Sequence, residues 1–80
     1  MGDAAKTLNQ IVSKVLLLDE AKIDDHTYLK DIKTWDSLTH LLLITEVETA
    51  FGVMIGDEDI TRIRTIGDIR TILTKLGAHP

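Results

Sequence analysis

The sequence predicts an all-α fold: a four-helix bundle of three principal helices and one short helix, with a long loop between the first and second helices. Apolar residues recur at helical spacing along most of the chain, and helix-capping residues stand where these apolar stripes begin and end. No segment shows the sustained alternation of apolar and polar residues that is typical of a β-strand. Because 80 residues suffice for one hydrophobic core, we expect a single domain over residues 1–80.

The first helix is expected at about residues 4–17, with Asp3 as its N-cap. Between residues 18 and 35 no helical period persists, which is typical of a loop. A loop of this length in a small domain usually has a function. We expect it to be attached to the core by Ile23, Tyr28, Leu29, Ile32 and Trp35.

The second helix is expected at about residues 37–51, since Asp36 is a favoured N-cap and Gly52 suits the left-handed residue that ends a helix. At about 100° per residue this helix has two apolar faces. Either the long loop covers the second face, formed by Leu38 and Leu42, or these two residues are an exposed patch for a partner. The expected core face consists of Leu41, Ile44, Val47 and Phe51, with Leu43 and Ala50 at its edge.

A short helix with an acidic start is expected at about residues 57–62, and the last helix at about 66–76. Thr65 and Asp68 resemble a capping box, in which each side chain accepts a hydrogen bond from the other residue's backbone N–H. Gly77 would end the last helix. The expected core stripe of this helix consists of Ile66, Ile69, Leu73 and Leu76.

The charge pattern argues against a nucleic-acid binder. Acidic residues number 13 and basic residues 9, for a net charge of −4, and the basic residues form no stripe of the kind that phosphate binding requires. Acidic clusters at Asp24-Asp25 and Asp57-Glu58-Asp59 favour basic protein partners. These acids lack the ligand spacing and central glycine of a calcium loop, so no metal site is expected.

The chain has no cysteine, which excludes disulfides and cysteine metal sites and is compatible with a reducing compartment. Its first residues lack the basic and then apolar layout of a signal peptide. No apolar run approaches the length that spans a membrane. We therefore expect a cytoplasmic monomer without a membrane span.

Asp36-Ser37-Leu38 marks the start of the second helix. Taken alone, this triplet is typical of an ordinary helix start, where aspartate and serine cap free N–H groups. Its surroundings, from about residue 29 to residue 77, resemble the acyl carrier protein family. The resemblance rests on Trp35-Asp36-Ser37-Leu38, Glu46-Val47-Glu48, Phe51-Gly52-Val53, Ile55, Asp57-Glu58 and Ile63-Arg64-Thr65-Ile66-Gly67-Asp68-Ile69.

The resemblance implies a carrier and not an enzyme, on which a separate phosphopantetheinyl transferase joins 4′-phosphopantetheine to the Ser37 hydroxyl. Acyl groups would be held on this arm as thioesters and presented to acyl-loading and acyl-using enzymes. Asp36 would help the transferase and its metal ion to engage the site. The residues implied to contact partners are Glu46, Glu48, Asp57 and Glu58 as an acidic surface, and Leu38, Leu42 and Ile55 as apolar contacts.

Several residues depart from the fatty-acid members of that family. Thr39-His40-Leu41-Leu42 stands where those members usually carry acids, Arg62 and Arg64 add positive charge, and Gly56 often corresponds to proline. We therefore expect a carrier of a specialised lipid, polyketide or small-acid pathway. The alternatives are a peptidyl or aminoacyl carrier, although the Gly-Gly-x-Ser signature is absent, and a helical protein-interaction module without a cofactor. We interpret His40 as a boundary residue that fills a surface position, in preference to a catalytic group or a pH sensor.

Overall fold

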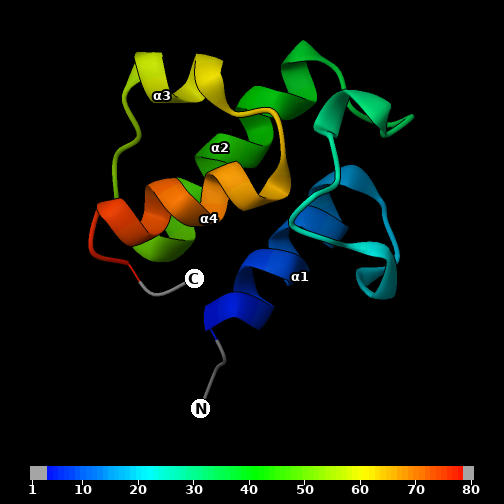
Figure 1. Ribbon diagram of the computed structural model, residues 1–80, viewed down its shortest axis with the longest axis horizontal. Helices are drawn as coiled ribbons and strands as arrows, with labels where there is room; N and C mark the ends of the chain where they lie inside the picture. Colours follow the sequence, from blue (N-terminus) through cyan, green and yellow to red (C-terminus); the bar gives the residue numbers. More distant parts are fainter. Residues whose placement is uncertain (1–3, 79–80) are drawn as a thin grey trace.

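The computed structural model of the chain describes residues 4–78 and confirms the all-α fold. Between residues 4 and 78 there is no strand, and the β-type pairing is an isolated bridge between Tyr28 and Thr65. In Figure 1, α2 passes behind α4 near the middle of the molecule, while α1 and α3 lie on either side. The elements in order are α1 (Ala4–Leu16), the 3-10 turns η1 (Glu20–Lys22) and η2 (Leu29–Asp31), α2 (Ser37–Phe51), α3 (Asp57–Arg62) and α4 (Ile66–Lys75).

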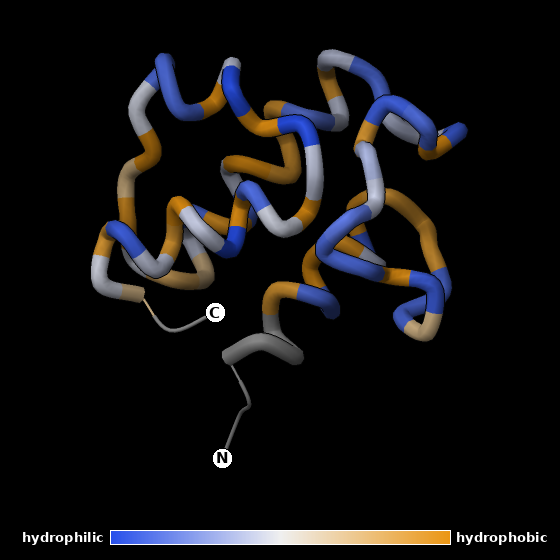
Figure 2. Tube along the Cα trace, in the orientation of Figure 1, coloured by the Kyte–Doolittle hydropathy of each residue, from blue (hydrophilic) through white to orange (hydrophobic). Residues whose placement is uncertain are grey.

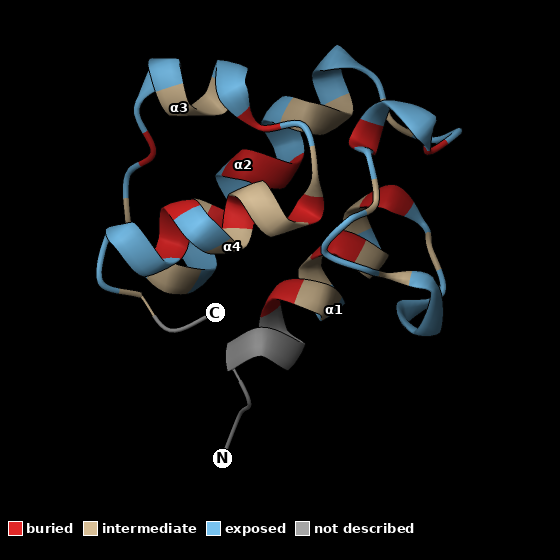
Figure 3. Cartoon of the chain, viewed as in Figure 1, coloured by how far each residue is buried: buried red, intermediate tan, exposed pale blue. Residues whose placement is uncertain are grey.

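The core lies where the apolar faces of α1, α2 and α4 meet. The apolar segments of these helices turn toward the centre of the molecule in Figure 2, and the buried residues gather there in Figure 3. The helix α3 has no fully buried residue, but its Ile60 packs against the core from a half-buried position. The buried residues of the three core helices are Leu8, Val12 and Leu16 of α1, Leu43, Ile44 and Val47 of α2, and Ile66, Ile69, Ile72 and Leu73 of α4.

The first helix ends at Leu16, one residue earlier than expected. Leu17 adopts a left-handed backbone with φ of 55°, which stops the helical hydrogen-bond pattern. The hydroxyl of Thr34 donates to the carbonyl of Leu16, and the Leu18 N–H donates to the Ser13 carbonyl, so two of the carbonyls at this end have partners. The expected N-cap, Asp3, lies outside the described residues.

The segment between α1 and α2 is held by both side chains and backbone. Leu29 and Ile32 are buried as expected, and Ile23 and Trp35 pack against the core while half-buried. Tyr28 is 49% exposed, so the expectation that its side chain anchors the loop is wrong. Backbone bonds hold this part of the loop instead, because the Leu29 N–H donates to the Arg64 carbonyl at 2.9 Å.

The buried face of α2 is rotated from the expected one. Leu43 is fully buried although it was expected at the edge of the core face, and Leu41 is 54% exposed although it was expected inside. The reason is that the bundle contacts α2 along the side centred on Leu43, Ile44 and Val47, which leaves Leu41 beside Leu38 on the outer side. Asp36 and Gly52 cap the helix as expected, and Gly52 has φ of 66°.

The last helix carries the expected capping box. The Thr65 hydroxyl accepts from the Asp68 N–H, and the Asp68 carboxylate accepts from the backbone N–H groups of Arg64 and Thr65 at 2.9 and 3.1 Å. The expected stripe is wrong at its end, since Leu76 is 42% exposed and Ile72 is buried instead. The helix ends at Lys75, before Leu76 could continue the buried face.

The capping box is expected to make the stability of the fold sensitive to acid. The N–H groups of Arg64 and Thr65 stabilise the ionised carboxylate and hold the pKa of Asp68 below its ordinary value of 3.8. Its stabilising effect is therefore present above about pH 4 and is lost as the pH falls through the lowered folded pKa. We expect Asp68→Asn to cost about 1 kcal/mol of unfolding free energy at neutral pH, and this difference should shrink toward pH 2. Urea unfolding at several pH values measures it, and a constant difference would contradict the assignment.

Candidate functional site

Ser37 is the first residue of α2 and is exposed to solvent. The residue before it, Asp36, has an extended backbone, and its carboxylate accepts a hydrogen bond from the Thr39 N–H at 2.8 Å. This bond fixes the first turn of the helix and therefore the direction in which Ser37 projects. The same N–H lowers the pKa of Asp36 below 3.8, so this side chain is a carboxylate at neutral pH.

His40 lies one turn after Ser37, but it is a structural bridge. The indole N–H of Trp35 donates to its Nδ1 at 3.2 Å, so its Nε2 carries the hydrogen and donates to the Ile60 carbonyl at 3.1 Å. The Trp35 and His40 rings also meet edge to face, with centroids 5.7 Å apart. His40 is thus half-buried and not merely a surface filler, and both of its nitrogens are occupied, so neither can activate Ser37.

This bridge joins three parts of the fold around Ser37. Trp35 belongs to the loop, His40 to α2 and Ile60 to α3. A shallow hollow of about 420 Å³ lies next to them, and we call it the serine-side hollow. It is lined by Trp35, Ser37, His40, Leu41, Ile60, Thr61 and Ile63.

An exposed apolar surface adjoins Ser37 on α2. Leu38 is 79% exposed, and Leu41 and Leu42 are 54% and 51% exposed. We call these three residues the leucine patch. Their spacing of i, i+3 and i+4 places them on one side of the helix, and this signal in the sequence could have assigned Leu41 to the outer side. Such a cluster beside a functional residue is typical of a contact surface.

The apolar partner contact expected in the loop after α2 is not exposed. Ile55 is buried, at 5% exposure, so the expectation that it contacts partners is wrong. Its backbone N–H donates to the Glu48 carboxylate at 2.8 Å, and this bond turns the side chain toward the core. The exposed apolar residue of this loop is its neighbour Met54, at 87%, which the sequence reading did not single out.

The expected acids divide into two groups. Glu46 and Glu48 are half-buried on α2, and Glu48 holds the loop after the helix in the way just described. Asp57 and Glu58 are exposed in the first turn of α3, whereas the serine-side hollow touches only the later part of that helix. The four acids thus come from two different helices, and their contact with partners stays a prediction.

The described residues offer neither a metal-binding cluster nor a membrane-spanning helix. No group of three histidine, cysteine, aspartate or glutamate side chains in this part of the chain gathers closely enough to hold a metal ion. No helix described is both long and apolar enough to cross a membrane.

The geometry defines a class of protein: a small helical domain that presents one exposed serine at a capped helix start. A family model described as "Phosphopantetheine attachment site" matches residues 6–73. An acyl carrier protein of Thermotoga maritima is 34% identical over 68 residues, covering 85% of this chain and 84% of the relative. One of Rhodococcus erythropolis is 33% identical over 73 residues, covering 90% and 79%.

A solved structure agrees with this assignment. The structure of "a putative acyl carrier protein" from Mycobacterium tuberculosis aligns with a TM-score of 0.81 and 31% identity, covering 89% of this chain and 95% of that one. The chain belongs to the acyl carrier protein family. Members of this family are carriers and not catalysts, and the group that they bear is phosphopantetheine.

Proposed function

We propose that Ser37 is the residue that bears 4′-phosphopantetheine and that acyl groups are held on this arm as thioesters. The observation that carries the proposal is the exposure of Ser37 at the first position of α2, directly after a capping aspartate. The start of a helix offers free N–H groups and the positive end of the helix dipole, and both suit a phosphodiester. Asp36, Ser37 and Leu38 are all exposed, so an incoming enzyme can reach the serine.

Attachment would require an external enzyme, since the neighbouring His40 has no free nitrogen. In this step the Ser37 oxygen bonds to the phosphorus that carries pantetheine in coenzyme A. The phosphoanhydride bond breaks, the nucleotide half leaves, and the serine proton passes to a base of the transferase. The ionised Asp36 stands beside the serine and can help to hold the metal ion of that enzyme.

The test is modification in vitro. The chain is incubated with coenzyme A, magnesium and a broad-specificity phosphopantetheinyl transferase, and its intact mass is measured. We expect the mass of the pantetheinylated form, and we expect Ser37→Ala to remove it completely. The matched control is Ser13→Ala, which leaves the start of α2 unchanged. Failure with several transferases would favour the alternative, a helical interaction module that uses the leucine patch without a cofactor.

We further propose a specialised pathway with dedicated partner enzymes. The helix face next to Ser37 is apolar, formed by Leu38, Leu41 and Leu42, where an acidic face would be expected of a fatty-acid carrier. Partners would therefore need an apolar surface complementary to the leucine patch, with basic residues at its edge for the acids of α2 and α3. We place this function in the cytoplasm, where coenzyme A supplies the arm, and propose that the carrier acts as a monomer.

A substitution in the leucine patch is expected to weaken partner binding without affecting the fold. Leu42→Asp should leave the helical circular dichroism unchanged, because the residue is half exposed. It should lower the rate of loading by the transferase by about fivefold or more, because an apolar contact is replaced by a buried charge in the complex. Thr49→Asp, with the same charge two turns farther along α2, is the control and should load normally. Unfolding of Leu42→Asp would show that this position belongs to the core.

A further inference from the structure

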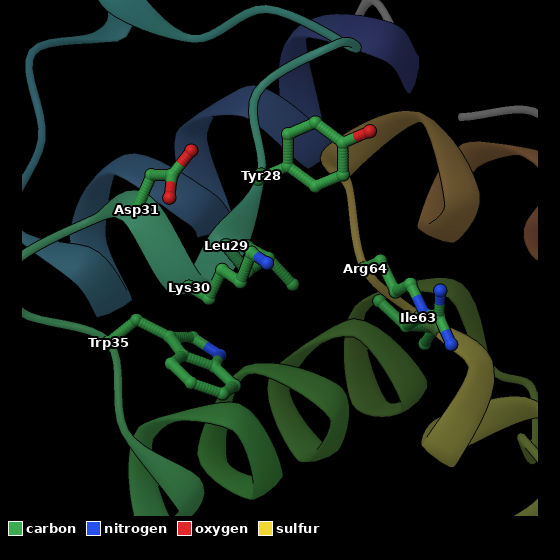
Figure 4. A pocket seen from close by; sticks show the side chains of 7 residues that line it. All are labelled: Tyr28, Leu29, Lys30, Asp31, Trp35, Ile63 and Arg64. Atoms are coloured by element: carbon green, nitrogen blue, oxygen red, sulfur yellow. The ribbon is translucent and has the colours of Figure 1, made fainter.

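A shallow groove leads away from Ser37 toward two cationic side chains. Beside the serine-side hollow lies a second hollow of about 660 Å³, between η2 and the junction of α3 with α4. Trp35 and Ile63 line both hollows, so the two hollows adjoin each other, and we treat them together as one groove. We call it the cationic groove. Its far part, drawn in Figure 4, is lined by Tyr28, Leu29, Lys30, Asp31, Trp35, Ile63 and Arg64.

Two charges face each other across the far part of this groove. In Figure 4, the ammonium of Lys30 is directed into the opening, and the side chain of Arg64 borders it from the opposite side. The carboxylate of Asp31 is directed away from Trp35. Within residues 4–78 the ion pair found joins Asp25 to Arg70, so neither cation is in one, and the Lys30 ammonium lies 5.9 Å from the centre of the Tyr28 ring.

The near part of the groove is apolar. The Trp35 indole and Ile63 form the stretch that the two hollows share, and Leu41 and Ile60 extend it toward Ser37. The Trp35 ring is held in place because its N–H is bonded to His40. The groove thus has an apolar wall near the serine and positive charge at its far end.

We propose that the cationic groove accepts a short acyl group that ends in a carboxylate, carried on the arm at Ser37. The alkyl part would lie against Trp35 and Ile63, and the carboxylate would lie between Lys30 and Arg64. The lining holds the two cations and one acid, so its charge is positive and suits an anionic group such as a carboxylate. This inference names the substrate class of the proposed function and rests on it.

The interaction is necessarily weak, and this suits a carrier. Ion pairs at exposed positions favour the paired state only slightly, so we expect the carboxylate to raise the ratio of docked to free arm by about twofold to fivefold. Added salt screens such pairs and should reduce this preference. An enzyme could therefore withdraw the acyl group without a large barrier.

The experiment compares two acyl groups that differ only in the terminal carboxylate. The ¹⁵N-labelled chain is loaded from adipoyl-coenzyme A or hexanoyl-coenzyme A by a broad-specificity transferase, and intact mass verifies each product. Trp35 is the only tryptophan, so its indole N–H gives one resonance that reports directly on the groove. We expect the adipoyl arm to shift this resonance and the amide signals of residues 30 and 64, more than the hexanoyl arm does, with the difference reduced by salt.

Variants locate the charge that recognises the acyl group. Lys30→Gln and Arg64→Gln should each reduce the difference between adipoyl and hexanoyl arms, and the double variant should abolish it. Arg62→Gln is the matched control, because Arg62 is exposed and lines neither hollow of the groove. Equal shifts for the two arms, no shift with either, or a difference that survives in the double variant would overturn the inference. Failure to load either arm would instead overturn the proposed function of Ser37.

Discussion

Replacing Leu43 by alanine is expected to lower the free energy of unfolding by about 2–5 kcal/mol. The Leu43 side chain has no exposed surface and lies in the core between α1, α2 and α4. Its truncation removes apolar burial and leaves a cavity that the neighbouring side chains fill only in part. A domain of this size has about 5–15 kcal/mol to lose, so the variant would be close to the limit of stable folding.

The matched control is Leu41→Ala on the same helix. Leu41 is 54% exposed, so its truncation should change the unfolding free energy by no more than about 0.5 kcal/mol. The unfolding of both variants by urea is monitored by far-UV circular dichroism. Comparing how steeply the free energy of unfolding falls with urea concentration distinguishes a change in stability from a change in the unfolded state. A loss for Leu41→Ala as large as that for Leu43→Ala would contradict the observed orientation of α2, and a larger one would favour the face expected from the sequence.

The comparison of Leu41 with Leu43 also shows what the sequence can and cannot predict. The capping residues Asp36, Gly52 and Thr65 were predicted correctly, because caps depend on neighbours only a few residues away. The orientation of α2 was not predicted correctly, because apolar residues occur on most sides of this helix. Which side is buried then depends on where α1 and α4 pack, and this is a tertiary property.

The residues of the candidate site likewise divide into those that a local motif predicts and those that only tertiary packing brings together. Ser37 and Asp36 could be named from the sequence because a local motif and its downstream pattern define them, and the start of α2 presents them as expected. The role of His40 could not be predicted from the sequence, because its hydrogen bonds reach Trp35 in the loop and the carbonyl of Ile60 in α3. Lys30 and Arg64 are separated by more than thirty residues in the printed sequence, and only the folded chain brings them to one groove.

The loop that forms one wall of this groove depends on a close contact at Gly67. The Gly67 N–H donates to the Asp25 carbonyl at 2.9 Å, and a Cβ at this glycine would lie only 2.8 Å from the same oxygen. Contacts this short force atoms apart, and the obstructing atom is backbone. Nearby bonds fasten the same segment, since the Ile66 N–H donates to the Thr27 carbonyl and Arg70 pairs with Asp25.

We therefore expect Gly67→Ala to destabilise the fold by about 1–3 kcal/mol, although alanine is the better residue within a helix. The loop would have to move away from α4, which weakens the bonds of Asp25 and Thr27 and loosens the segment that carries Lys30. Gly56→Ala is the matched control, because that site has open space and φ of −67°, so no clash arises and any loss, from the poorer N-cap of α3, should stay below about 1 kcal/mol. Urea unfolding gives both free energies, and hydrogen exchange at the amide of residue 67 should accelerate only in Gly67→Ala. A neutral Gly67→Ala would mean that the loop yields without cost, and the groove would then lack the rigid wall that recognition of a charged acyl group requires.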